Sequence, residues 1–412
     1  MLAGTARRTL GFWLLAATEV LFFGASSAPS PLYVVYQARW QFSSFTLTVV
    51  FAAYAAALLL TLLTMGGLSD YLGRRRVIAA SLLLELAAMV AFLTAHGVGW
   101  LVVARGVQGV ATGLAAGALS AAVSDLVPGG RLLLATTVNT AAPSIGLAAG
   151  ALASGALVQY APSPRILVFV VFAVAFAVLL VAVAVVPETV RRRPGAVASV
   201  RPRAAVPPQA RTTFRAAAPV LVATWAVGGL ALSLGPSLAA GIFGVRNHVV
   251  GGLVVTAVAG VSALGSVVAR GAAARPTMVR GSLVLVVGVA LVLGSLAATS
   301  TTLFFVGLVI TGWGFGTAFI GAFGSVALLA EPEQRAELFA AVYAASYLSF
   351  GGSAVLAGLA VPTFGLRPVA TGYGAAVIAL SLLAAGLGRR PTAVATGDPL
   401  DARPGPVAMG AE

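Results

Sequence analysis

Three charged side chains, two carboxyl groups and one guanidinium, stand inside long apolar segments of the sequence, where the carboxyl groups could bind and release protons. Glu19 lies near the middle of the first such segment, Glu85 in the third and Arg105 in the fourth. A lone charge inside a membrane costs at least ~2.5 kcal/mol, so each group needs a partner, a wet cavity or a neutral form. A carboxyl group buried near the middle of a bilayer favours its protonated form. We therefore predict that Glu19 binds protons or a cationic ligand.

Each of these charges also has a structural interpretation. Glu19 could pair with another helix, and Arg105 could extend its long side chain to the outer membrane interface. For Glu85 the alternatives are a structural hydrogen bond or ion pair and a direct functional role. The sequence leaves these alternatives open.

Polar side chains repeat at helical spacing after both Glu19 and Arg105, so each charge belongs to a polar stripe. We predict that the two stripes line a cavity for a small molecule, through Ser30 and Tyr33 on the first segment and Gln108 and Thr112 on the fourth.

The eleventh apolar segment carries an aromatic and hydroxyl face at positions i, i+3, i+4 and i+7, namely Tyr343, Ser346, Tyr347 and Phe350. We predict that Trp225 and Trp313 join this face to form a substrate-binding surface. The alternative is that the stripe serves packing alone.

Composition places the chain in a membrane. Of its 412 residues, 59% are hydrophobic and 9% are charged, and the mean hydropathy is +1.01. Too few polar residues remain to cover a water-facing surface. A bilayer core needs about 20 apolar residues per helix, and the chain predicts an all-α membrane protein with twelve transmembrane helices, near residues 10–35, 45–65, 76–96, 99–122, 133–158, 165–186, 216–240, 249–269, 281–299, 303–329, 338–360 and 368–388.

The same composition excludes several chemistries. The chain has no cysteine and two histidines, so thiolate chemistry is excluded and we expect no metal site. We find no nucleotide-binding motif and no converging nucleophile and base, and we predict neither a cofactor nor enzymatic activity. The net charge of +14 follows membrane topology rather than a basic domain, so no nucleic-acid partner is expected.

The arginines predict the orientation. With the N-terminus inside, 20 of the 25 basic residues fall in the cytoplasm, four fall outside and Arg105 lies in the membrane. Positively charged loops are retained in the cytoplasm. We therefore expect a multi-pass protein of the inner (plasma) membrane, acting as a monomer, with both termini cytoplasmic. An alternative reading of the N-terminus as a secretory signal peptide would break the repeat described next.

An internal repeat divides the chain into two halves. A shift of 206 residues superimposes Arg105-Gly106 on Thr311-Gly312 and Gly146 on Gly352, a pattern of repeated halves that many transporters share. We predict a six-helix bundle over residues 1–186, a proline- and arginine-rich cytoplasmic linker over 187–215, a second bundle over 216–390 and a disordered cytoplasmic tail over 391–412. Prolines near residues 28–31 and 234–237 predict paired breaks in the first helix of each half, either as gating hinges or as plain helix ends.

The loop over residues 66–78 is the most specific segment, because it places Asp70 and three consecutive arginines between two apolar segments. It resembles the signature loop between the second and third helices of the major facilitator superfamily, with matches at Gly67, Asp70, Gly73, Arg74 and Arg75. The resemblance implies two six-helix bundles and a secondary transporter in which this loop acts as a conformational latch. The alternative is that its arginines only hold the loop inside and bind lipid phosphates. The equivalent loop of the second half, residues 270–280, lacks the Asp.

Two further runs resemble motifs of the same superfamily. The run over residues 101–109 is similar to its fourth-helix motif, which links Arg105 to proton or substrate coupling. The run over residues 139–150 is similar to the fifth-helix motif of proton-linked antiporters and adds Asn139 and Pro143 to the predicted cavity, although Ala142 and Leu147 stand where that motif has glycine.

From these resemblances we expect a bacterial, drug-efflux-like exporter of a small amphipathic organic compound, driven by protons. An importer or facilitator of a sugar or organic acid is the alternative transporter. A membrane receptor on the same fold is the alternative outside transport.

Overall fold

The computed structural model describes residues 2–200, 204–329, 331 and 334–389. Within them, twelve helical stretches are long and apolar enough to cross a membrane, which agrees with the twelve expected from hydropathy. The first half contains α1 (Leu2–Ser27), α2 (Pro29–Trp40), α3 (Ser44–Met65), α4 (Ser69–Leu72), α5 (Arg74–Leu93), α6 (Val98–Leu126), η1 (Pro128–Gly130), α7 (Leu132–Tyr160), α8 (Pro164–Ala182) and η2 (Val183–Val185).

The second half follows a connecting segment that contains α9 (Ala196–Ser199) and η3 (Pro208–Ala210). It contains α10 (Arg211–Ser233), α11 (Gly235–Phe243), α12 (His248–Val268), α13 (Ala274–Ala298), α14 (Thr301–Ala327), α15 (Arg335–Phe364) and α16 (Leu366–Arg389). Helix α10 therefore begins inside the segment that we assigned to the linker. The predicted tail over 391–412 lies outside the described residues.

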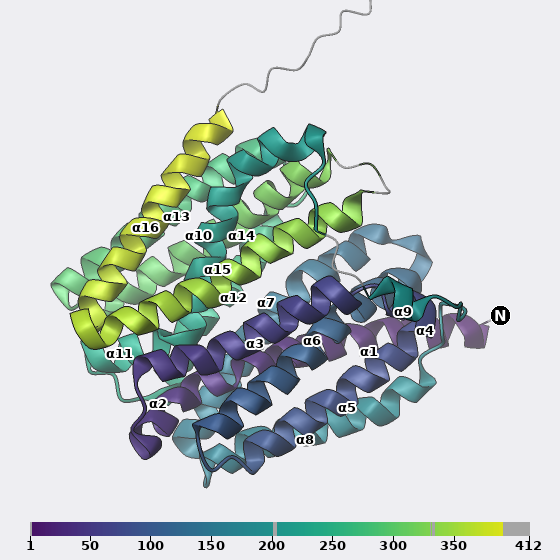
Figure 1. The fold of residues 1–412 in the computed structure, drawn as a ribbon, viewed down its shortest axis with the longest axis horizontal. Helices are drawn as coiled ribbons and strands as arrows, with labels where there is room; N and C mark the ends of the chain where they lie inside the picture. The colour runs from purple at the N-terminus through teal and green to yellow at the C-terminus, as the bar shows by residue number, and fades with distance from the viewer. Residues whose placement is uncertain (1, 201–203, 330, 332–333, 390–412) are drawn as a thin grey trace, which may run out of the picture.

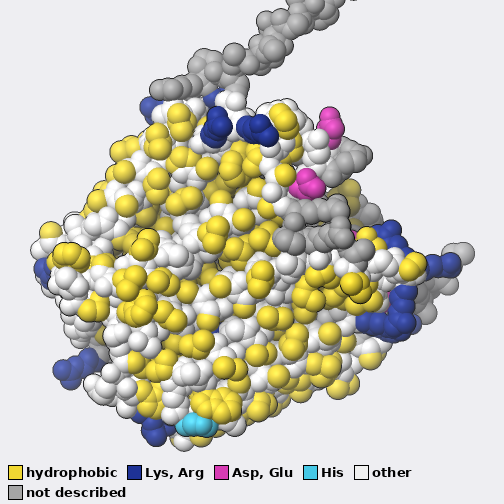
Figure 2. Space-filling view, viewed as in Figure 1, with side chains coloured by type: hydrophobic (Ala, Val, Ile, Leu, Met, Phe, Trp, Pro, Cys, Tyr) yellow, Lys and Arg dark blue, Asp and Glu magenta, His cyan; other side chains and the backbone are white. Residues whose placement is uncertain are grey.

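The two halves form adjacent helical bundles (Figure 1). The elements of the first half, drawn from purple to blue with α8 in cyan, lie in the lower part of this view, and the green and yellow helices of the second half lie above them. The visible surface is mainly hydrophobic across its middle, and arginine side chains appear towards its margins (Figure 2). This distribution is that of a protein embedded in a bilayer.

The paired helix breaks lie where the prolines predict them. Helix α1 gives way to α2 at Ala28, and α10 gives way to α11 at Leu234. Proline has no backbone N–H to donate to the preceding turn, and both Pro29 and Pro236 fall within the first two residues of the helix that follows. Whether the breaks act as hinges remains a prediction.

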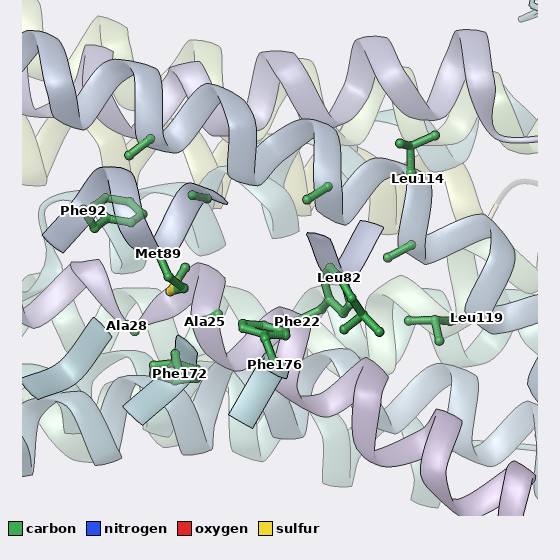
Figure 3. Close-up of a cluster of buried hydrophobic side chains, with 14 of the residues drawn as sticks. Phe22, Ala25, Ala28, Leu82, Met89, Phe92, Leu114, Leu119, Phe172 and Phe176 are labelled. Atoms are coloured by element: carbon green, nitrogen blue, oxygen red, sulfur yellow. The ribbon is translucent and has the colours of Figure 1, made fainter. Parts of the chain in front are cut away.

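Each bundle has its own apolar core. In the first half, Phe22 of α1, Phe92 of α5 and Phe176 of α8 are among the buried side chains that fill the space between these helices (Figure 3). On α6, Gly109 allows close packing on α3, because a Cβ there would overlap the backbone of Tyr54. Small residues at such contacts let membrane helices approach each other closely.

The halves meet along two seams. One joins α3 to α15, and the other joins α7 to α12. Polar bonds cross between the halves: Thr256 Oγ1 donates to the Ala148 carbonyl at 2.9 Å, and Ser30 Oγ donates to the Leu232 carbonyl at 2.5 Å. The helices that carry the predicted site are therefore held together at the centre of the molecule.

Candidate functional site

Arg105 points into the first bundle. Its side chain is 1% exposed, and its Nη1 donates to the Ser26 carbonyl at 2.8 Å. The guanidinium carbon lies 4.5 Å from the ring centre of Tyr54 and 5.9 Å from that of Phe51, within the range of cation–π attraction. The alternative in which Arg105 extends to the membrane interface is therefore wrong for this structure.

Gln108 connects Arg105 to Glu85. Its Oε1 accepts from Arg105 Nη1 at 2.7 Å, and its Nε2 donates to Glu85 Oε1 at 2.9 Å and to the Ala25 carbonyl at 3.1 Å. Glu85 and Gln108 are both fully buried. Glu85 thus makes the hydrogen bond that its structural interpretation predicts, and we call Glu85, Gln108 and Arg105 the polar network.

Gln108 and Thr112 differ from their expected placement. We expected both to line the cavity, but both are 0% exposed. The side-chain amide of Gln108 is hydrogen-bonded within the polar network. Thr112 Oγ1 donates to the carbonyl of Gln108 at 2.9 Å. The polar face of the fourth helix is directed at α1 and α5. A buried arginine with no carboxylate in direct contact must be hydrogen-bonded to neutral acceptors, and here these are the Ser26 carbonyl of α1 and the amide oxygen of Gln108.

Glu19 lies apart from this network, on α1. It is 3% exposed, and its Oε2 has no hydrogen-bond partner among the described residues. Tyr343 of α15, in the other half, lies within electrostatic range of its carboxyl group. The buried carboxyl of Glu19 is thus close to the junction of the two halves.

Aromatic side chains gather where the halves join. The ring of Trp225 lies 4.6 Å from that of Tyr347 and 5.6 Å from that of Phe350. Phe350 in turn contacts Phe51 of the first half at 4.9 Å between ring centres. The predicted aromatic face of α15 therefore forms a cluster with Trp225, and this cluster extends into the first half. We call it the junction cluster.

The prediction that Trp313 joins this aromatic surface is wrong. It is 37% exposed, and no ring contact joins it to Trp225 in the described part of the chain. The α14 ring that contacts Trp225 is that of Phe319. At 100° per residue, Phe319 lies about 120° around the helix axis from Trp313. Sequence spacing across two helices did not reveal this rotation.

Several buried polar atoms near the junction lack a protein partner. Among the described residues these include Glu19 Oε2, Trp225 Nε1 and Ser346 Oγ. Tyr33, which we expected in the cavity, is buried in the first-half core beside Arg105. Buried polar groups are nearly always hydrogen-bonded, so unpartnered ones drawn from both halves are candidate contacts for a ligand. Ser30, by contrast, is already bonded across the junction.

The signature loop forms a compact ionic cluster at one end of the first bundle. Arg74 pairs with Asp70, and its Nη1 donates to Ser69 Oγ at 2.6 Å. Gly73 adopts φ of +97°, a conformation that side chains disfavour. Gly67 is exposed and meets no side chain there, so its role in the loop is that of a turn residue.

Two carboxylates that we had not included complete the ionic cluster. Glu188 Oε1 accepts from the backbone N–H of Arg74 at 2.8 Å, so it caps the first turn of α5. Asp125, at the end of α6, lies 3.5 Å from Arg74 Nε. Arg75 Nη1 also donates to the carbonyl of Ala184 at 3.3 Å. The sequence signal was available, because acids are few in this chain, and Glu188 directly precedes the arginine run at 191–193 while Asp125 stands at the same end of its helix.

The fifth-helix motif packs against the helix that carries Glu19. Cβ atoms at Gly146 and Gly150 of α7 would overlap the backbone of Val20 and Gly24. Pro143 lies within α7, and Asn139 Nδ2 donates to the Ser120 carbonyl at 3.1 Å. Asn139 thus lies between α6 and α7, towards the end of α7 that is closer to the ionic cluster.

Two helical bundles, a buried polar network in one of them and a junction cluster between them define a polytopic membrane protein built for transport of a small molecule. The sequence model of the Major Facilitator Superfamily matches residues 15–275. The chain belongs to this superfamily and is a transporter rather than an enzyme. A sequence search of curated proteins found no match.

Solved structures share the fold at low sequence identity. A bacterial homologue of the human lysosomal transporter Spinster, in an inward-facing and unoccupied conformation, has a TM-score of 0.76 at 13% identity, over 93% of this chain and 97% of that one. The nucleoside transporter NupG has a TM-score of 0.69 at 12% identity, over 92% and 99%. The human organic anion transporter MFSD10 has a TM-score of 0.63 at 17% identity, over 92% and 99%.

Proposed function

We propose that this transporter exports a small amphipathic organic compound in exchange for protons. One observation carries the proposal: the carboxyl group of Glu19 is buried beside the junction of the halves, and one of its oxygens has no partner among the described residues. A buried carboxyl that lacks a fixed cation binds a proton readily. It releases the proton when water or a cation reaches it, which is what a coupling site requires.

The polar network supports this role for Glu19. Arg105 supplies a buried positive charge to this network. It is held by the Ser26 carbonyl, two residues before the break at Ala28, and by Gln108. A change at Arg105 would therefore be transmitted to the helix that carries Glu19.

The junction cluster supports an amphipathic substrate. It offers large aromatic faces together with unpartnered polar atoms on Trp225, Ser346 and Glu19. Aromatic faces bind apolar or weakly cationic groups, whereas a sugar requires many hydrogen bonds. These features favour a compound with an apolar body and few polar groups over a sugar or an organic acid.

The topology and the direction of transport belong to the same proposal. The arginine distribution supports an orientation in the plasma membrane with both termini in the cytoplasm. In this proposal the protein acts as a monomer whose two bundles cover residues 1–186 and 216–390. Export is supported by the antiporter-like run on α7, whose Gly146 and Gly150 hold α7 close to the helix of Glu19.

The test uses Glu19→Gln protein in liposomes. A thermal-shift screen of apolar and weakly cationic compounds supplies the transported probe, namely the compound that raises the melting temperature most. We expect Glu19→Gln to lose transport driven by a pH gradient while it retains exchange of labelled for unlabelled probe. The matched control is Thr18→Val, because the bond that Thr18 Oγ1 makes among the described residues is to Leu14 of its own helix.

The outcomes separate the alternatives. Unchanged dependence on the pH gradient in Glu19→Gln would refute the coupling role. Probe binding without flux in either direction in the unmodified protein would favour the receptor. Gradient-driven accumulation on the side of the termini would favour the importer.

A further inference from the structure

A cavity of about 230 Å³ lies at the end of the molecule where α2 and α11 meet. Pro31 and Val34 of α2 form its wall in the first half, and Pro236 of α11 lies on the side of the second half. The segment between α11 and α12 completes the lining. The cavity is thus bounded by both halves and is separate from the junction cluster.

Three consecutive residues of that segment bring hydrogen-bond donors to the lining. They are Arg246, Asn247 and His248. Asn247 uses its Oδ1 to accept from the backbone N–H of Val249 at 2.8 Å, which leaves its NH₂ group as a donor. The backbone N–H of His248 is bonded to Gln159 Oε1 at 2.9 Å. The first N–H groups of α12 are therefore occupied, and a ligand would be held by side chains.

The charge at this end is uncompensated. The connections between helices here contain no Asp or Glu, whereas Arg39, Arg165, Arg246 and Arg367 stand at their edges. At the opposite end, Arg74 is neutralised by Asp70 and Asp125. No ion pair involves Arg246 in the described part of the chain. A cationic wall without a counter-charge attracts anions, and a concave surface raises their local concentration.

We propose that this cavity binds a phosphate group, carried by a lipid or free in solution, and that the bound phosphate holds this end of the two halves together. A guanidinium binds phosphate oxygens through paired charge-assisted hydrogen bonds, and the neighbouring amide and imidazole add neutral donors. The apolar side of Pro31, Val34 and Pro236 suits the carbon atoms attached to a phosphate ester. This site is independent of proton coupling and of the direction of transport.

The absence of cysteine from the chain allows a direct test. Ala240 lines the cavity, so the Ala240→Cys variant places a single thiol there, and its rate of labelling by a maleimide reports access. Purified protein in detergent is labelled by the maleimide in the presence of inorganic phosphate, and in the presence of chloride at equal ionic strength for comparison. A second pair of reactions compares added phosphatidylglycerol with an added glycolipid that has no phosphate. Tyr160→Cys, on a residue that is 76% exposed at the same end, controls for reactivity of the reagent.

We expect a phosphate-bearing probe to slow labelling of Ala240→Cys, and Arg246→Gln to raise the concentration required about tenfold or more. Arg39→Gln removes an exposed charge at the same end and should leave the effect intact. Protection by inorganic phosphate supports the site with a free anion as its ligand, and protection by phosphatidylglycerol alone supports it with a lipid. The proposal is overturned if neither probe slows labelling. It is also overturned if Arg246→Gln protein, with a melting temperature equal to that of Arg39→Gln, is protected at the same probe concentration as protein that keeps Arg246.

Discussion

Arg105 joins the charge chemistry of the first half to the junction between the halves. It holds the α1 backbone through the Ser26 carbonyl, and its guanidinium lies over the ring of Phe51, which contacts Phe350 of the second half at 4.9 Å. A single residue, Phe51, thus separates a buried positive charge from a side chain of the opposite bundle. A shift of either half would change the environment of that charge.

Gln108 should be important for stability, because it is the only described side chain bonded to both Arg105 and Glu85. We predict that Gln108→Met, which keeps similar volume, removes both bonds and leaves two buried ionisable groups without them. The expected loss is about 2–5 kcal/mol, measured as a lower melting temperature of purified protein.

The matched control for this prediction is Thr112→Val. Its hydroxyl donates to the carbonyl of Gln108 and lies beside the hydroxyl of Tyr54, and its removal leaves the bonds of Gln108 to Arg105 and Glu85 in place. The expected loss is therefore smaller, about 1 kcal/mol. Equal melting temperatures for Gln108→Met and the unmodified protein would show that the polar network does not contribute to stability.

At the scale of helices, the halves are unequal. The third and fourth spans of the first half, α5 and α6, are joined by the bond from Gln108 to Glu85. The corresponding α13 and α14 meet where Gly288 packs against Thr311, and an apolar cavity of about 70 Å³ lies beside Thr311. The sequence repeat therefore preserves the packing of helices but not their chemistry, which supports assignment of coupling to the first half.

The helices were predictable from sequence because each depends on local properties. Apolar length located all twelve spans, and Pro29 and Pro236 located the breaks. The side-chain partners were not predictable in this way. Gln108 was expected in the cavity and Trp313 at the junction, and both placements depend on the rotation of a helix about its axis. That rotation is determined by contacts with neighbouring helices, which a single sequence does not contain.

The signature loop carries the prediction at this scale. Asp70→Asn removes the ion pair with Arg74 but keeps Arg74 bonded to Ser69. If the loop is a latch, turnover in liposomes should fall about two- to fivefold, the effect of one partly exposed ion pair, with normal insertion into the membrane.

Arg76→Gln is the control for the latch, since Arg76 is an exposed arginine of the same loop and no described contact assigns it to the ionic cluster. Turnover of Asp70→Asn equal to that of the unmodified protein would refute the latch. An equal decrease in both variants would favour the interpretation in which the loop only retains charge and binds lipid.

For the whole molecule, the seams between the halves determine which motions are possible. Bonds cross the α7–α12 seam at several depths, from Gln159 with His248 at one end, through Ala148 with Thr256, to Thr137 with Arg270 near the other. Transport by rocking of two bundles requires the α2–α11 end to open during each cycle. The α3–α15 seam near that end should therefore separate.

A disulfide across this seam provides the test. A Cβ at Gly358 of α15 would lie 2.9 Å from the Cβ of Thr48 of α3, so a small separation of the helices reaches the roughly 3.5–4.5 Å of a disulfide. We predict that oxidised Thr48→Cys/Gly358→Cys protein loses transport and regains it on reduction. The control is Ala274→Cys/Gly324→Cys, whose Cβ atoms would lie 3.4 Å apart within the second half, and its oxidation should leave transport intact. Full transport by the oxidised pair at Thr48 and Gly358, with the bond verified, would mean that the halves do not separate at this end and that the substrate crosses by another motion.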